Sequence, residues 1–174
     1  MLLGAASRAS AQCPDGTPPP CRTGVVASSP RRTALALNPR AWIVVPFGNV
    51  MKAQDLDWLR DASVNLITLD MSRWNDVSVV PDKRVGDLVR ELPSPKGSET
   101  LTLNDGMAVA RRAGAGMLVM GDFLRQGRGA RIIANVFDVR TGAKVRTVSQ
   151  QASEQDSLLG AFGPLARGAR RGRH

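Results

Sequence analysis

The sequence predicts an α/β domain built on one mixed sheet, with elements in the order β-α-β-α-α-β-β-β-α. A continuous apolar run of strand length, residues 41–47, is typical of a strand covered on both faces. A helical period follows in residues 54–73, and the last third changes to three apolar runs separated by turn residues. Helix-linked strands followed by a meander of hairpins favour a mixed sheet with helices packed on it.

Local signals place the other elements. Asp82 is a fair N-cap for one helix, which Pro93 stops. Asn104 or Asp105 is expected to cap the next helix, and Gly114 to end it. The predicted strands and helices cover residues 41–47, 54–73, 77–80, 82–92, 105–113, 117–124, 131–139 and 144–149, with a last helix starting at 158.

The formal charge of +9 comes from 24 basic and 15 acidic residues, and the basic residues are mostly Arg, as GC-rich coding often produces. Arg167, Arg170, Arg171 and Arg173 gather at the C-terminal end, so a folded basic face for nucleic acid is not expected. A tail that binds nucleic acid or an anionic surface stays as an alternative. No apolar run approaches the roughly 18 residues of a membrane helix, so we expect no integral membrane segment.

The N-terminus indicates the remnant of an export signal. Residues 1–6 are a short apolar run, and residues 9–11 (Ala-Ser-Ala) fit a small-x-small cleavage pattern. The other interpretation of residues 1–11 is an ordinary flexible N-terminus. An export signal predicts a periplasmic or secreted protein.

Both cysteines, Cys13 and Cys21, lie in the stretch CPDGTPPPC. Zinc sites usually pair CxxC motifs with further Cys or His ligands, and His174 is the one histidine in the sequence. A redox CxxC is absent too. In an exported protein, the simplest outcome is a Cys13–Cys21 disulfide that closes a small loop. Residues 12–40 are therefore predicted to be a flexible tether that carries this loop.

Residues with catalytic potential are few. The predicted domain has no His and no Cys, and the chain has no Tyr. Asp55, Asp57, Asp61 and Asp70 fit a solvated helix face with ordinary pairing along the helix. The Gly-Ala-Gly of 114–116 follows a helix and precedes a strand, which is the reverse of a dinucleotide-binding loop. We predict no catalytic, cofactor-binding or metal-binding residues; a small hydrolase that uses Asp and Ser stays as a second alternative.

Three tryptophans, Trp42, Trp58 and Trp74, fall at the first strand, the first helix and the end of that helix. Packing in the core is the ordinary role of such residues. Trp58 is offset from the apolar stripe of its helix, which makes it the predicted contact for a partner protein.

Several blocks occur in an order that resembles the TolB amino-terminal-like domain, a family related to CsgG and LpoB. They are IVVPFGN (43–49), LDWLRDA (56–62), LITLDMSRW (66–74), VSVVP (77–81), AVARRAGAGMLVMGDF (108–123) and RIIANVFDVRTG (131–142). The resemblance implies a Rossmann-like or anticodon-binding-like sandwich, a non-enzymatic role in assembly or interaction, and a place in the bacterial envelope. It also implies the N-terminal part of an exported protein with repeats downstream.

The predicted organisation is a signal remnant in 1–11, a tether in 12–40, the TolB-like domain in 41–151, and a helix start with a basic, truncated tail in 152–174. The predicted function is a non-enzymatic, exported protein-interaction or assembly domain of the envelope. Its expected partners are envelope proteins, with no small-molecule substrate and no cofactor.

Overall fold

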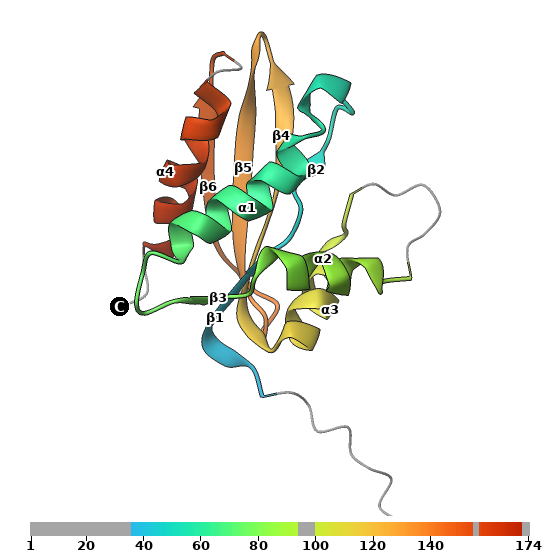
Figure 1. Ribbon diagram of the computed structural model, residues 1–174, viewed down its shortest axis with the longest axis vertical. Helices are drawn as coiled ribbons and strands as arrows, with labels where there is room; N and C mark the ends of the chain where they lie inside the picture. The colour runs from blue at the N-terminus through green and yellow to red at the C-terminus, as the bar shows by residue number, and fades with distance from the viewer. Residues whose placement is uncertain (1–35, 94–99, 155–156, 172–174) are drawn as a thin grey trace, which may run out of the picture. The chain divides into compact units, whose positions relative to one another are not determined.

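The computed structural model describes residues 36–93, 100–154 and 157–171. The predicted order of elements is confirmed, with a two-residue strand and a 3-10 turn added after the first strand (Figure 1). The elements are β1 (Asn38–Val44), β2 (Gly48–Asn49), η1 (Gln54–Leu56), α1 (Leu59–Met71), β3 (Ser78–Val79), α2 (Asp82–Arg90), α3 (Leu103–Ala113), β4 (Ala115–Gln126), β5 (Gly129–Asp138), β6 (Lys144–Ala152) and α4 (Leu158–Arg170).

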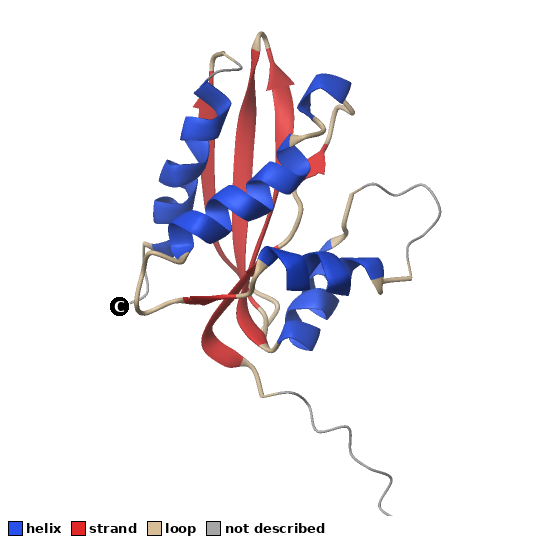
Figure 2. Cartoon of the chain, viewed as in Figure 1, coloured by secondary structure: helices blue, strands red, loops and turns tan. Residues whose placement is uncertain are grey.

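The strands form one mixed sheet in the order β3-β1-β4-β5-β6. β3, β1 and β4 run parallel, as helical crossovers require, whereas β4, β5 and β6 form the predicted antiparallel meander (Figure 2). β2 pairs with β4 beyond the end of β1, at Asp122 and Phe123. The late meander therefore completes the layer that β1 begins.

The continuous apolar sequence of β1 follows from burial on both faces of the sheet. Trp42 and Val44 pack in one hydrophobic cluster with α1 and α4. Ala41, Ile43 and Val45 pack in a second cluster with α2 and α3. Because successive side chains of a strand point to opposite faces, an unbroken apolar run is the pattern that a doubly covered strand needs.

Helix α4 belongs to the same packing as the sheet. Leu158, Phe162 and Leu165 are almost fully buried in the cluster shared with α1. Val148 of β6 lies so close to Gly168 that a Cβ there would stand 2.7 Å from its methyl group. Burial on this scale stabilises α4 despite its internal proline and glycines.

Several element ends differ from the prediction. β1 spans Asn38–Val44 instead of 41–47, and α2 has Pro81 at its N-cap instead of Asp82 and ends at Arg90. Residues 54–73 form η1 and then α1, separated by a short turn, instead of one helix. The cap of α3 is Thr102, whose hydroxyl accepts a hydrogen bond from the Asp105 backbone N–H while the Asp105 carboxylate accepts one from the Thr102 N–H. This reciprocal capping box starts the helix before Asn104. Gly114, at φ 70°, ends it as predicted.

Two glycines mark opposite packing environments. Gly121 of β4 faces Phe47, and a Cβ there would lie 2.6 Å from the ring and against the backbone carbonyl of Ile133. Gly160 of α4 has nothing within 4 Å of a Cβ. Only the first position requires glycine for packing.

Candidate partner-binding surface

The segment between β2 and α1, residues 49–58, exposes three large apolar side chains. Val50 is 55% exposed, Met51 61% and Trp58 41%. Most apolar side chains of this size in the described residues are buried. Three exposed ones within ten residues therefore form an unusual apolar patch for a surface segment. Trp58 thus lies at the surface, where the sequence predicted it.

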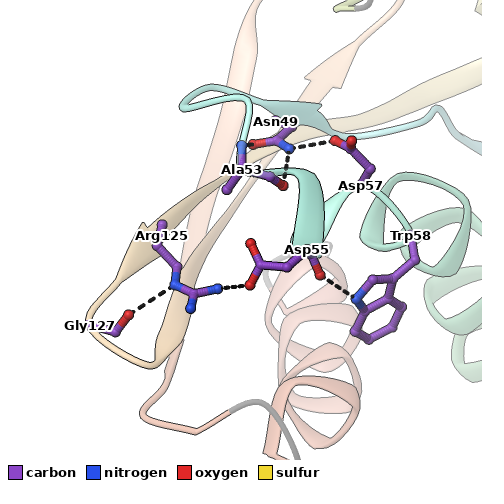
Figure 3. A network of polar contacts seen from close by, with 7 residues as sticks. All are labelled: Asn49, Ala53, Asp55, Asp57, Trp58, Arg125 and Gly127. Carbon is purple, nitrogen blue, oxygen red and sulfur yellow. Dashed lines mark hydrogen bonds and ion pairs between the residues drawn. The ribbon is translucent and has the colours of Figure 1, made fainter.

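Asn49 is the internal support of this segment and is only 8% exposed. Its side-chain Nδ2 donates to the carbonyl of Ala53 at 2.9 Å and to Oδ1 of Asp57 at 2.6 Å. Its Oδ1 accepts from the backbone N–H of Ala53 at 3.1 Å (Figure 3). One buried amide therefore closes the turn at both of its ends.

Asp55 fixes the tryptophan and connects the segment to the sheet. Its backbone carbonyl accepts a hydrogen bond from Trp58 Nε1 at 3.0 Å, and its carboxylate pairs with Arg125 of β4 (Figure 3). The Nε of Arg125 donates in turn to the carbonyl of Gly127 at 2.9 Å. The ion pair is partly exposed and adds little stability, but it sets the position of the segment against the β4–β5 turn.

The backbone of this segment is strained at Lys52. Its φ of 51° lies in the left-handed region, which non-glycine residues adopt at a cost of roughly 1 kcal/mol. Its N–H donates to the Asn49 carbonyl at 3.2 Å, which holds the turn in this conformation. Strain held by a surrounding network is a common feature of binding loops.

The acidic residues near α1 have two different roles. Asp61 and Asp70 lie on the helix itself, and Asp70 pairs with Arg73 at 3.6 Å, three residues along. Asp55 and Asp57 precede the helix and instead bind Arg125 and Asn49. Of the four aspartates predicted to share a solvated helix face, only Asp61 and Asp70 lie on the helix.

Two surface hollows lie beside α1. One, of about 340 Å³, is lined by Pro46, Asp61, Val64, Asn65, Asp82, Lys83, Val85, Gly86 and Arg90. The other, of about 380 Å³, lies between α1 and α4 and is lined by Leu66, Leu69, Asp70, Arg73, Leu159, Gly160, Phe162, Gly163, Pro164 and Arg167. Across the residues that the structure describes, no group of three His, Cys, Asp or Glu side chains is placed to hold a metal ion.

Among the described carboxyls outside these hollows, Asp122 has a raised pKa, whereas Asp76 and Asp138 have lowered ones. Burial raises the pKa of Asp122, on β4 beside Gly48, above the ordinary aspartate value.

At least one of the C-terminal arginines makes contacts within the folded domain. Arg170 ends α4, donates to both carboxylate oxygens of Asp76 and lies 4.9 Å from the ring centroid of Trp74. The Asp76 pKa is lowered, first through that hydrogen bond. Residues 172–174 and both cysteines, Cys13 and Cys21, lie outside the described residues. The predicted disulfide therefore stays a prediction.

Sequence reasoning missed Asn49 and Arg125. Asn49 directly follows a strand-ending glycine, a position where an asparagine often bonds nearby backbone, so a local signal existed. Arg125 had no such signal, because Asp55 lies 70 residues away and the two meet only through the sheet topology.

No family model and no curated protein matches this chain. Solved structures with a similar fold include the LpoB C-terminal domain from Salmonella enterica, with 12% identity, 68% of this chain and 85% of that one covered, and a TM-score of 0.46. TolB from Acinetobacter baumannii has 12% identity, 74% and 26% covered, and a TM-score of 0.42. Lipoprotein GNA1162 from Neisseria meningitidis has 16% identity, 74% and 92% covered, and a TM-score of 0.47.

TolB, whose amino-terminal domain the sequence blocks resemble, and LpoB, of a family related to it, are both among the structures similar to this fold. The resemblance to CsgG and the downstream repeats stay predictions, and identities this low transfer no function. Among the helices of the described ranges, none combines the length and the apolar character needed to cross a bilayer.

Proposed function

We propose that this chain is a non-enzymatic protein-binding domain of the bacterial envelope, periplasmic or secreted. It contacts an envelope protein through the exposed apolar side chains of residues 49–58, with Trp58 as the anchor. It takes no small-molecule substrate and no cofactor. The observation that carries the proposal is a tryptophan that is 41% exposed and yet held by a hydrogen bond to Asp55.

Tryptophan, with tyrosine and arginine, is enriched at the energetic centre of protein interfaces. Association also costs free energy when loops and side chains become ordered. The bonds of Asn49 and Asp55 order this segment before any partner arrives, so less of that cost remains. A surface loop without such bonds would lose more conformational entropy on binding.

Support for an envelope location comes from the sequence. The TolB-like blocks, the export-signal pattern in residues 1–11 and the predicted disulfide tether in 12–40 agree with one another. The described domain contains neither cysteine, so the predicted disulfide would stabilise the tether alone.

The test is capture of proteins from an envelope extract with the full-length chain, comparing Trp58→Ala with wild type by quantitative mass spectrometry. Leu159→Ala is the matched control, because Leu159 is 53% exposed and lies on α4. We expect one set of proteins to be depleted about tenfold by Trp58→Ala and unchanged by Leu159→Ala, as for the loss of an interface hot spot. Circular dichroism should show that both variants fold, with about 1 kcal/mol lost in Trp58→Ala through its hydrogen bond.

Equal capture by Trp58→Ala and wild type would contradict the proposal. The polyanion alternative is tested by a salt series together with the Arg171→Glu/Arg173→Glu variant. Deleting the last helical turn is a poor substitute, because Ala169 is buried and Arg170 binds Asp76. Capture that falls steeply with salt and with the arginine substitutions, but not with Trp58→Ala, would favour the polyanion alternative.

A further inference from the structure

Strand β6 is a long open edge of the sheet. It has nine residues and pairs with β5, and no other strand in the described part of the chain pairs with its outer side. The opposite edge is β3, with two residues, which is too short to align a partner strand. An unpaired row of backbone N–H and C=O groups is a template for a further strand.

Helix α4 covers one face of β6 but is not a strand on its edge. The close approach of Gly168 to Val148 places the helix over the face of the strand. Covering an edge with a helix or a loop is one way in which proteins prevent strand addition. Here the face is covered, and the sheet order leaves the edge as the place for a new strand.

The charge around this edge is mostly positive. Residues 125–152 contain six basic residues and one acidic residue, Asp138. The Asp138 carboxylate accepts hydrogen bonds at 2.9 Å from the backbone N–H groups of Arg140 and Thr141, within its own turn. Strand β6 itself carries Lys144 and Arg146 and no acidic side chain.

Several basic side chains near this edge are not neutralised by an acidic partner in the described ranges. Within the described residues, Arg128, Arg131, Lys144 and Arg146 form no ion pair, whereas Arg125 pairs with Asp55. Arg131 lies opposite Gln151 of β6 on the neighbouring strand. An extended segment added to β6 therefore lies next to the cations of the edge strand, with Arg131 one strand further away.

We infer that β6 binds an extended, acidic segment of a partner protein as an added strand of the sheet. Main-chain hydrogen bonds would supply affinity, and acidic side chains facing Lys144 and Arg146 would supply selectivity. A second copy of this chain is disfavoured as the occupant, because its β6 carries no acidic side chain that would complement Lys144 and Arg146. The inference rests on the proposed protein-binding role but on residues other than Trp58.

The test uses the full-length chain and a defined probe. A fluorescent, end-capped peptide of nine residues, alternating Glu with Val or Thr, is titrated at low ionic strength and followed by fluorescence anisotropy. Its counterparts are the same peptide with Lys in place of Glu and the same acidic peptide N-methylated at alternate residues. We expect the acidic peptide to bind about tenfold more tightly than either counterpart, because only it offers both the charge and the backbone donors.

Protein variants then locate the site. Lys144→Glu/Arg146→Glu should weaken acidic-peptide binding about tenfold and favour the Lys peptide. The matched control is Lys83→Glu/Arg84→Glu, which makes the same change in net charge on exposed positions of α2. Trp58→Ala should leave peptide binding unchanged, so failure of the Trp58 proposal and failure of this one are distinguishable.

Several results would overturn the inference. They are absence of acidic-peptide binding, equal binding of the N-methylated peptide, and an equal effect of the control pair on α2. A dimer in light scattering that Lys144→Glu/Arg146→Glu disrupts would assign the edge to a second copy. Tighter binding of a nine-nucleotide single-stranded DNA would assign it to a polyanion. The peptide comparison uses the unaltered protein, so it decides the matter even if a variant fails to fold.

Discussion

Substitution of Asn49 by Ala tests whether one buried amide holds residues 49–58 in place. The change removes two bonds to the backbone of Ala53, each contributing about 1 kcal/mol, and one to Asp57. Asp57 is exposed and regains water, so its bond adds less. Because the three bonds share one side chain and are not additive, we expect a loss of about 2–3 kcal/mol in the free energy of unfolding.

Urea denaturation followed by circular dichroism measures this loss as a lower midpoint at an unchanged slope. Asn65→Ala is the matched control, because Asn65 is an exposed asparagine on α1 and its loss should stay within about 0.5 kcal/mol. If Asn49→Ala costs no more than Asn65→Ala, the amide does not organise the segment and the reasoning is refuted.

Three further predictions concern strain, packing and charge. Lys52→Gly should stabilise the protein by about 1 kcal/mol in the same denaturation, since glycine adopts its φ of 51° freely; a loss of stability would show that the turn is not strained. Gly121→Ala should destabilise strongly and Gly160→Ala should stabilise by about 0.5–1 kcal/mol, so thermal midpoints that move in the same direction would contradict the packing described. Asp122→Asn should stabilise at neutral pH and have little effect in acid. Burial raises the folded-state pKa of Asp122, so its native state binds the proton more tightly and stability falls as pH rises from the ordinary aspartate pKa through the raised one. A variant with the same pH profile of stability as wild type would contradict that assignment.

The order of strands and helices could be predicted because it follows from the spacing of apolar residues and from local stop residues such as glycine and proline. The apolar run of β1, the helical period of α1 and the stop at Gly114 are local signals, and each corresponds to an element of the structure. The start of α3 was misplaced because Asn104 and Thr102 are both acceptable caps, and only the reciprocal bonds with Asp105 select Thr102.

The extent of α4 was harder to predict for a physical reason. Gly160, Gly163, Pro164 and Gly168 are weak helix formers, so the local pattern suggested a helix that soon ends. Burial of Phe162 and its apolar neighbours against the sheet outweighs those propensities, and the helix continues to Arg170.

Of the candidate surface, only the exposure of Trp58 could be predicted, and its role as a partner contact stays a proposal. The offset of Trp58 from the apolar stripe of its helix indicated exposure, and the structure places it at the surface. The hydrogen bond of Trp58 to Asp55 spans only three residues, whereas the ion pair of Asp55 with Arg125 spans 70 and no local pattern encodes it. The exposure of Trp58 thus follows from a local sequence pattern, whereas the contact between Asp55 and Arg125 depends on how the sheet is connected.

The most direct measurement is site-specific photo-crosslinking in the source cells, with the photoreactive residue at Met51, which is 61% exposed in the proposed surface. The account predicts a discrete crosslinked protein at this position, lost when Trp58→Ala is added, and none from the same probe at Leu159 on α4. Equal products from both positions, or a product at Met51 that Trp58→Ala leaves unchanged, would contradict it.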